Sequence, residues 1–388
     1  MAQPITIVGA GPAGLAAAIA IKHRGGDAVV YERHKEVGAR FHGDFQGLEN
    51  WTTEGDVLDE LGSFGIEADF QYTPFRECVL FDPDGKEIEI RSTRPLWYLV
   101  QRGTGPGTLD QALKRQALTA GAEIKFSESV QHLPDGGIVA HGPRRADAIA
   151  VGYTFETDMA DGAYAAVSDE LAPGGYAYLM ICGGRGTLAT CMFSDFHNER
   201  DYLERSMDFF RARAGLKWRN ESRFGGFGNM EVQPKLRRGQ MLFAGEASGL
   251  QDFLFGFGMR FAMISGHYAG VAHMNGDLDS YPQLYRQRLR SLTKAGAVNR
   301  FLYNRAGNRG YGSLIRRVAA SEDPRNWARR YYRSRWWTSL IYPLALVESR
   351  FRHRHDPIDD CRDECDCTWC RCTQESGGRK AAERSFAS

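Results

Sequence analysis

The chain carries IVGAGPAGLAAAIAI at residues 7–21, close to its first residue. A short β-branched run, ITIV at residues 5–8, leads into this stretch, and an alanine-rich segment from about Leu15 to Lys22 follows it. A strand, a glycine-rich turn and a helix in this order are typical of dinucleotide-binding domains. The free N–H groups and the dipole at the start of such a helix favour a bound pyrophosphate.

The three glycines of this turn have different roles. Gly9 permits the tight turn, Gly11 lets the main chain approach a pyrophosphate, and Gly14 allows the helix and strand to pack closely. A second expected strand, residues 28–31, ends on Glu32, whose carboxylate is placed to accept hydrogen bonds from ribose hydroxyls. Because this carboxylate would repel a 2′-phosphate, the sequence predicts FAD or NAD rather than a nucleotide that carries a 2′-phosphate. A glycine-rich turn without a ligand is the disfavoured alternative.

A second glycine-rich stretch, LFAGEASGLQDFLFGFGM at residues 242–259, decides between these two nucleotides. Residues 241–244 are expected to form a buried strand. The Gly245-Glu246 pair at its end resembles the second FAD fingerprint of the glutathione-reductase-like flavoproteins. This resemblance implies that Glu246 binds the ribityl chain, although the family usually has aspartate there. A protein that binds only NAD has no reason for a second site, so the sequence favours FAD.

The rest of this stretch is expected to surround the flavin ring. The resemblance implies that Gly249, Gly256 and Gly258 let the main chain pass beside the ring. An apolar helix from about Met259 to Met274 would then point its amino terminus at the pyrimidine edge of the flavin. The dipole of such a helix stabilises negative charge on reduced flavin.

These motifs, together with Arg40 and the segment YLVQRGTGPGTLDQAL around Arg102, resemble the geranylgeranyl reductase family. This family lies within the flavoproteins that have the p-hydroxybenzoate-hydroxylase fold, and the resemblance spans about residues 1–300. We therefore expect an α/β protein with a Rossmann-like FAD-binding domain, an interleaved antiparallel-sheet substrate domain and a helical C-terminal region. The implied cofactor-binding residues are Gly9, Gly11, Pro12, Ala13, Gly14, Glu32, Arg33, Arg40, Arg102, Val130, Gly245, Glu246, Gly256, Gly258 and Met259.

The expected domains are interleaved along the chain. Alternating segments such as TFETD, GYAYLMI and TLATCMF indicate the strands of the substrate sheet. We expect an FAD-binding domain from residues 1–70, 101–150 and 236–280, a substrate domain from 71–100 and 151–235, a helical region rich in basic and aromatic residues at 281–355, and a cysteine-rich tail at 356–388.

Candidate substrate and catalytic residues come from the same resemblance. PGGYAY at residues 173–178 is similar to the substrate-side strand of archaeal prenyl reductases. Tyr176 and Tyr178 would share one strand face, either as substrate contacts or as ordinary core residues. His42 stands where those reductases commonly have a cysteine, and a surface histidine is the alternative. His42, Tyr176, Tyr178 and Cys182 are the candidate proton donors, and the sequence does not choose among them.

The predicted function is an FAD-dependent oxidoreductase that reduces C=C bonds of a prenyl or other apolar lipid by hydride transfer from reduced flavin. The alternatives are an FAD-dependent monooxygenase of the same fold and a membrane-associated flavoprotein electron carrier. Asp161-Gly162 lacks the neighbours of the Asp-Gly motif that helps related hydroxylases to use NADPH. The electron donor therefore stays open between NADPH, ferredoxin and another reductant.

Charge and hydropathy suggest where the protein acts. Lysine and arginine number 49 against 48 acidic residues, which gives no case for nucleic-acid binding. No leader precedes the first expected strand, so we expect a cytoplasmic protein.

The apolar run at residues 338–347 is too short to span a bilayer. Its flanking arginines and tryptophans fit peripheral contact with the inner face of a membrane, and a helix packed on the protein is the alternative. These arginines are Arg329, Arg330, Arg333, Arg335, Arg350, Arg352 and Arg354.

The tail contains five cysteines within twelve residues. Such a cluster can supply four ligands to zinc or to an iron–sulfur cluster. An unstructured tail with free thiols is the alternative. The candidate ligands are Cys361, Cys365, Cys367, Cys370 and Cys372.

Overall fold

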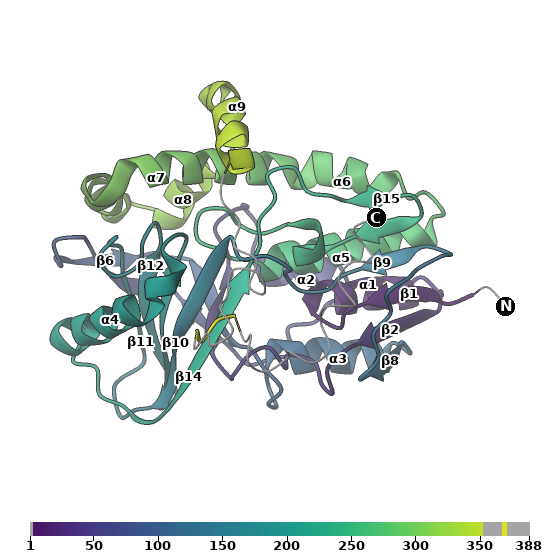
Figure 1. Ribbon diagram of the computed structural model, residues 1–388, viewed down its shortest axis with the longest axis horizontal. Helices are drawn as coiled ribbons and strands as arrows, with labels where there is room; N and C mark the ends of the chain where they lie inside the picture. The colour runs from purple at the N-terminus through teal and green to yellow at the C-terminus, as the bar shows by residue number, and fades with distance from the viewer. Residues whose placement is uncertain (1–2, 352–366, 371–388) are drawn as a thin grey trace.

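A computed structural model describes residues 3–351 and 367–370 of the chain. In Figure 1 a six-stranded sheet lies on the right and a seven-stranded sheet on the left. Helices α6 (Ser280–Arg288) and α7 (Arg290–Ala319) run along the top of both. The expected α/β class with a helical C-terminal region is confirmed.

The six-stranded sheet contains the first strand of the chain. The neighbours of β1 are β2 and β9, and both pair with it in parallel. The chain returns to this sheet about one hundred residues after β9, with β15, and β16 then adds in parallel beside β9. The order across the sheet is β15 (Arg237–Arg238), β16 (Met241–Phe243), β9 (Gly137–Val139), β1 (Ile5–Val8), β2 (Ala28–Glu32) and β8 (Glu123–Phe126).

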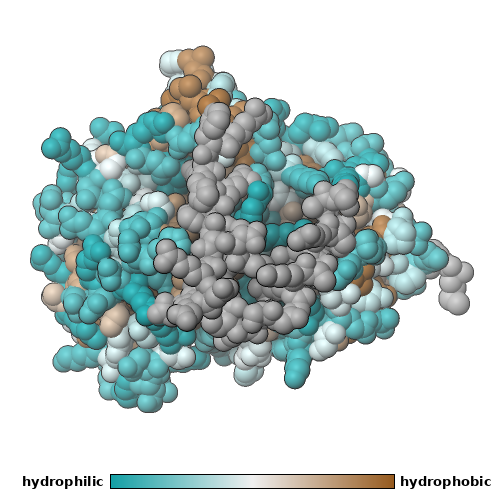
Figure 2. All heavy atoms as spheres, viewed as in Figure 1, coloured by the Kyte–Doolittle hydropathy of each residue, from teal (hydrophilic) through white to brown (hydrophobic). Residues whose placement is uncertain are grey.

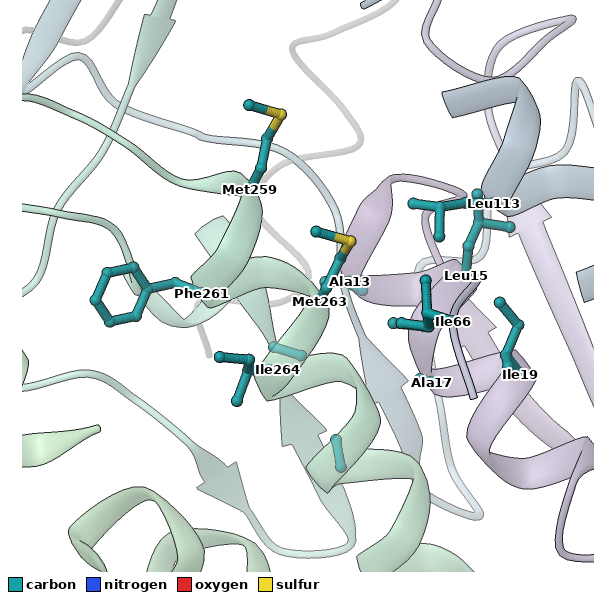
Figure 3. Close-up of a cluster of buried hydrophobic side chains, with 14 of the residues drawn as sticks. Ala13, Leu15, Ala17, Ile19, Ile66, Leu113, Met259, Phe261, Met263 and Ile264 are labelled. Atoms are coloured by element: carbon teal, nitrogen blue, oxygen red, sulfur yellow. The ribbon is translucent and has the colours of Figure 1, made fainter. Parts of the chain in front are cut away.

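Helices α1 (Pro12–Lys22) and α5 (Met259–Met274) pack closely beside this sheet. In Figure 3, Ala13 of α1 lies next to Met263 of α5. The apolar side chains of both helices belong to one core, which also includes Leu113 of α3 (Leu109–Thr119). The beginning and the middle of the chain therefore form a single hydrophobic unit.

The seven-stranded sheet is antiparallel except where β11 pairs with β5. Helix α4 (Glu199–Ala214) packs against β13 and β10, and its apolar residues share a core with theirs. The order across the sheet is β14 (Arg219–Gly228), β10 (Ala148–Glu156), β13 (Arg185–Met192), β12 (Tyr176–Cys182), β11 (Gly162–Ala166), β5 (Glu77–Phe81) and β6 (Glu87–Arg91).

A third sheet has three strands, β3 (Phe45–Glu49), β7 (Trp97–Gln101) and β4 (Tyr72–Phe75). We had expected all of residues 71–100 in the antiparallel substrate sheet, but β4 and β7 pair with β3 instead. The short helix α2 (Val57–Ser63) follows β3, and Asp56 caps it by accepting a hydrogen bond from the N–H of Leu58. Alternating hydropathy predicts a strand but not its partner, which explains the difference.

The C-terminal helices are α6, α7, α8 (Pro324–Tyr331) and α9 (Trp336–Phe351). Helix α7 is interrupted at Gly307, where φ is 54° and ψ is −168°. Helix α9 projects from the top of the molecule in Figure 1. Within the described ranges, no helix combines the length and apolar character that a membrane span requires.

Candidate active site

Helices α1 and α5 come into main-chain contact, and this brings the two glycine-rich turns together. A Cβ atom on Gly266 would lie 2.0 Å from the carbonyl oxygen of Ala13, and one on Gly270 would lie 2.7 Å from that of Ala17. The helices are therefore parallel, with both amino termini on the same side. Gly266 lies seven residues after the start of α5, whereas Ala13 lies one residue after the start of α1. At 1.5 Å per residue, this difference of six residues means that α5 begins roughly 9 Å before α1 along the shared axis.

The first turn fits closely on its neighbours on one side and is open on the other. Gly9 has a φ of 102°, and a Cβ on it would lie 2.6 Å from the carbonyl oxygen of Ala140. A Cβ on Gly14 would lie 1.9 Å from the carbonyl oxygen of Gly9. In contrast, a Cβ on Gly11 would meet no atom within 4 Å. The turn thus leaves space beside Gly11 for a ligand.

Glu32 at the end of β2 holds this turn in place. Its two carboxylate oxygens accept hydrogen bonds from the N–H groups of Ala10 and His34, each at 2.9 Å. Arg33 is exposed beside it. Val130 lines a shallow hollow together with Thr6. The ribose contact of Glu32 and the nucleotide contacts of Arg33 and Val130 stay predictions.

The second turn abuts the first. Gly245 has a φ of 59°, and a Cβ on it would lie 2.9 Å from the Cβ of Ala13. A carboxylate oxygen of Glu246 forms an ion pair with Arg40 at 2.7 Å. Arg40 also donates to the carbonyl oxygen of Phe227 at 3.0 Å, at the end of β14. Arg40 therefore connects the second fingerprint to the seven-stranded sheet.

Arg102 is buried near this site but is directed at a protein carboxylate. It donates two hydrogen bonds to Asp110, at 2.8 and 2.9 Å, near the start of α3. Its guanidinium also lies over the ring of Phe41, 4.0 Å from the centroid. Arg102 thus fixes the loop that carries Arg40 and Phe41.

Gln251 is a residue of the site that the sequence did not single out. Its side-chain nitrogen donates to the carbonyl oxygen of Gly256 at 2.8 Å. Its side-chain oxygen is buried, and no hydrogen-bond partner for it occurs among the described residues. A Cβ on Gly228 would lie 2.9 Å from this oxygen and 3.2 Å from Oε1 of Glu246. In the sequence, Gln251 is the one uncharged polar residue between Ser248 and Met259, in a run of phenylalanines and glycines. This position could have singled it out.

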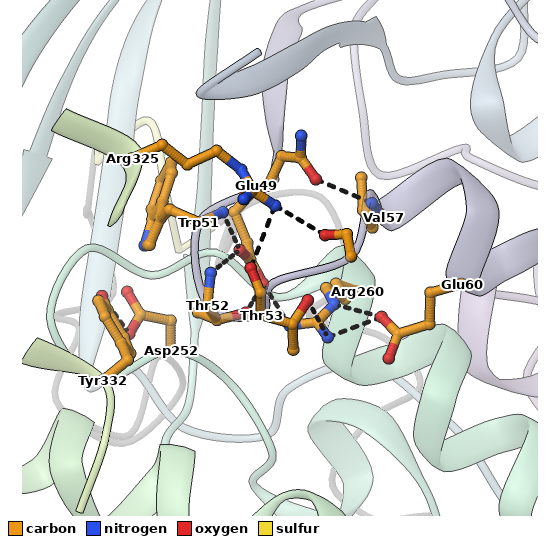
Figure 4. A network of polar contacts seen from close by, with 12 residues as sticks. Glu49, Trp51, Thr52, Thr53, Val57, Glu60, Asp252, Arg260, Arg325 and Tyr332 are labelled. Carbon is orange, nitrogen blue, oxygen red and sulfur yellow. Dashed lines mark hydrogen bonds and ion pairs between the residues drawn. The ribbon is translucent and has the colours of Figure 1, made fainter. Parts of the chain in front are cut away.

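A polar network holds the first turn of α5 (Figure 4). Arg260 is 3% exposed and forms ion pairs with Glu49 at 2.9 Å and with Glu60 at 2.6 Å. Burial opposes its charge, but these two carboxylates raise the pKa of Arg260 overall. Nearby, Asp252 accepts a hydrogen bond from Tyr332 at 2.9 Å. The network fixes Met259 and the loop before it.

These features fit FAD. A dinucleotide needs space at the first turn, and Gly11 is open there. A flavin ring presents polar edges, and the unsatisfied oxygen of Gln251 lies beside the second turn. The two helix amino termini also offer N–H groups and positive dipole ends on the same side of the molecule.

The two candidate tyrosines share one face of the seven-stranded sheet. Tyr176 lies opposite Cys191, and Tyr178 lies opposite Ala189. The hydroxyl of Tyr176 donates to the carbonyl oxygen of Phe255 at 2.9 Å, in the loop that follows the second turn. Burial raises the pKa of both tyrosines well above its usual value. Both hydroxyls therefore stay protonated at neutral pH.

Small residues separate aromatic side chains on this face. Gly152 and Ala189 lie between Phe224 and Tyr178 in one row across the sheet. Phe224 belongs to the same cluster as both tyrosines but was missed by the sequence reasoning. Cys191 was missed too, and burial raises the pKa of its thiol to about 12. Cross-strand neighbours of this kind cannot be read from a sequence without the strand register.

The remaining two catalytic candidates lie in different places. The ring of His42 stacks on Phe224, with centroids 6.2 Å apart, so His42 is close to the tyrosine face. Cys182 is at the other end of β12, where its sulfur lies 3.3 Å from the hydroxyl oxygen of Thr73. The structure thus places His42 with the tyrosines and separates Cys182 from them.

Three of the five predicted metal ligands, Cys361, Cys365 and Cys372, lie outside the described residues. Cys367 and Cys370 flank Trp369, which is 1% exposed and packs against Phe196 and Phe227. Residues 3–351 and 367–370 contain no group of three or more His, Cys, Asp or Glu side chains that could hold a metal ion. A zinc or iron–sulfur site therefore has no support from the structure.

Comparisons with known proteins agree with this geometry. A family model described as an NAD(P)-binding Rossmann-like domain matches residues 7–48. The digeranylgeranylglycerophospholipid reductase of Haloferax volcanii is 23% identical over 368 residues, which cover 80% of this chain and 88% of the relative. The predicted resemblance to geranylgeranyl reductases is confirmed.

Solved structures extend the comparison. A geranylgeranyl bacteriochlorophyll reductase-like protein from Thermoplasma acidophilum has a TM-score of 0.68 and 17% identity, and the match covers 89% of this chain and 98% of that one. A flavin-dependent brominase has a TM-score of 0.59 and 18% identity over the same shares of the two chains. The fold is therefore that of FAD-type flavoenzymes, and the chain resembles the geranylgeranyl reductases.

Proposed function

We propose that this protein binds FAD and reduces carbon–carbon double bonds of a prenyl or other apolar lipid. The convergence of the two glycine-rich turns, with Gly245 packed against Ala13, carries the proposal. Bound FAD, once reduced, supplies a hydride. The lipid substrate is suggested by the similarity to a digeranylgeranylglycerophospholipid reductase.

The chain's own residues would position the substrate and supply a proton. Tyr176, Tyr178 and Phe224 form an apolar, aromatic cluster on one face of the seven-stranded sheet, and we propose that this cluster lines the lipid site. Both tyrosine hydroxyls carry a proton at neutral pH, as any tyrosine does, and are therefore candidate general acids. Burial raises the pKa of each, which makes the proton harder to release. His42 lies close enough to this face to be a third candidate. Cys182 is the weakest candidate, because it lies at the far end of β12.

The electron donor is proposed to be NADPH, ferredoxin or another reductant. Asp161, whose setting lacks the NADPH-linked pattern, accepts a hydrogen bond from the N–H of Gly183 at 2.8 Å. This contact fixes a turn of the seven-stranded sheet. A local structural role for Asp161 agrees with a donor other than NADPH.

Anaerobic turnover tests the proposal. The purified protein is loaded with FAD, reduced with dithionite and mixed with prenyl lipids, while flavin absorbance and product mass are followed. Reoxidation of the flavin with addition of two hydrogens to the lipid is the expected result. Insertion of one oxygen atom after air is admitted would identify a monooxygenase instead. Unchanged lipids would leave an electron carrier as the better assignment.

A long apolar substrate must be drawn from a lipid phase. The proposal therefore includes peripheral contact of this protein with a membrane.

A further inference from the structure

An apolar stripe runs along the outer face of α9. Its residues are spaced three or four apart, so they lie on one side of the helix. Each is more than half exposed, and the tryptophan is 78% exposed. Figure 2 shows this stripe as a brown projection above a mostly hydrophilic surface. The residues of this α9 stripe are Trp336, Leu340, Leu344 and Val347.

The opposite face of α9 packs on the protein. Thr338 and Ala345 are buried there. The hydroxyl of Tyr342 donates to the carbonyl oxygen of Val232 at 3.4 Å. Glu348 forms an ion pair with Arg305 of α7 at 2.6 Å. These contacts hold α9 in one orientation, so the α9 stripe faces away from the protein.

The charges around the α9 stripe are basic. Arg330, Arg333 and Arg335 are exposed immediately before the helix. Glu348 is the one acidic residue in the sequence of α9, and Arg305 neutralises it. Basic side chains near the surface of an anionic bilayer are attracted to it, and a tryptophan at the end of an apolar face is typical of an interfacial helix.

We propose that the α9 stripe docks this protein on an anionic phospholipid bilayer, with α9 lying in the plane of the interface. The helix has 16 residues, fewer than the roughly 20 that a span requires. A second copy of the chain is a poorer partner, because a stable protein interface needs roughly 20 to 30 residues from each side. Four stripe residues do not provide such an area.

The link between docking and catalysis rests on the proposed function, but the docking itself does not. Binding to vesicles can be measured without substrate, electron donor or turnover. A protein that binds vesicles but reduces no lipid would refute the reductase and keep the docking surface. Turnover of a detergent-dispersed lipid without vesicle binding would do the reverse.

The test is co-sedimentation of the full chain with vesicles of phosphatidylcholine, with and without phosphatidylglycerol. We expect binding to the mixed vesicles that weakens with added salt. The double variant Leu340→Ser/Leu344→Ser should bind at least tenfold more weakly. Leu118→Ser is the matched control, since Leu118 is 45% exposed on α3 and should not affect binding.

A charge variant and a size measurement complete the test. Arg333→Ser/Arg335→Ser should remove the preference for phosphatidylglycerol and the salt dependence, while weaker binding to both vesicle types persists. Equal binding by the wild type and the Leu340→Ser/Leu344→Ser variant would overturn the proposal, as would no binding by the wild type. Light scattering that shows a dimer dissociated by the same double variant would assign the α9 stripe to a second copy and overturn it too.

Discussion

Two parts of the molecule, called here its two halves, are held together by different kinds of contact. The FAD half is the six-stranded sheet with helices α1 and α5, and the other half is the C-terminal helices α6 to α9. In the FAD half, main chain meets main chain, as at Gly14 and Gly266, where no side chain fits. In the C-terminal helices, arginine side chains reach across to carbonyl oxygens. Arg300 of α7 donates to Phe253 at 2.8 Å and also to Gly174 and Leu254.

Arg325 of α8 repeats this arrangement. It is 4% exposed and donates to the carbonyl oxygens of Glu54, Thr53 and Gly55 at distances of 3.1, 3.1 and 2.7 Å. A close contact between two main chains permits only glycine at that position. A long side chain, in contrast, can reach a carbonyl oxygen from many directions. Substitutions in the two halves should therefore differ in what they damage.

The largest expected effect follows from Gly14→Ala. Its Cβ would lie 1.9 Å from the carbonyl oxygen of Gly9, so the main chain of the turn has to move. We expect the free energy of unfolding to fall by about 4 kcal/mol and FAD to be lost. Urea unfolding and flavin absorbance of the purified protein measure the two effects.

Gly11→Ala is the matched control for the turn. Gly11 has a φ of −79°, which alanine adopts readily, and its Cβ would meet no protein atom within 4 Å. The stability of the FAD-free protein should stay within about 0.5 kcal/mol of the wild type, while FAD affinity falls. If Gly11→Ala binds FAD normally, the pyrophosphate does not lie at this turn.

The next effect concerns the segment at residues 367–370. Trp369→Ala removes a fully buried ring from between Phe196 and Phe227, and the cavity should cost about 3 to 5 kcal/mol. Trp336→Ala, at a tryptophan that is 78% exposed, should cost less than about 0.5 kcal/mol. Equal unfolding midpoints in urea for the two variants would show that residues 367–370 do not contribute to the fold.

A smaller effect is expected from Arg325→Met. The variant removes the donor to the carbonyl oxygens of Asn50, Thr53, Glu54 and Gly55, of which only Asn50 is a buried residue. We expect the free energy of unfolding to fall by about 2 kcal/mol. Arg330→Met, at an exposed arginine of the same helix, is the control and should be nearly neutral. The comparison of the two halves fails if both arginine variants unfold at the same urea concentration as the wild type.

The difference between the halves also explains what the sequence could predict. Gly9, Gly14 and Gly245 mark positions where only glycine fits, so the FAD fold and its two turns were predicted from short motifs. The strand partners of β4 and β7 were not predicted, because alternation of hydropathy carries no information on pairing.

The side-chain part of the site was predicted less completely. Tyr176 and Tyr178 were found by resemblance, but Phe224 and Cys191 come from other strands and join them only through register. Arg329 was expected among the arginines that flank a membrane-contacting segment, but it pairs with Glu54 at 2.9 Å. Arg325, which the sequence did not single out, is buried. A sequence lists charges without showing which of them face a carbonyl oxygen.

The last expected effect is a pH dependence at Asp252, where the two halves meet. This carboxylate accepts hydrogen bonds from the N–H of Phe255 at 2.7 Å and from the hydroxyl of Tyr332 at 2.9 Å. Burial raises the pKa of Asp252 to about 6, above the value of about 3.9 in an unfolded chain. Between these two values the folded protein binds a proton that the unfolded chain does not.

The contribution of Asp252 to the free energy of unfolding should therefore decrease as the pH rises from about 4 to about 6, by roughly 2 to 3 kcal/mol. Asp252→Asn cannot titrate, so the difference in stability between the wild type and this variant should change across that range in urea titrations. Tyr332→Phe removes a donor that favours the charged carboxylate, and it should move the change to higher pH. Parallel stability curves for the wild type and Asp252→Asn would show that Asp252 has an ordinary pKa, and that the junction between the two halves is open to water.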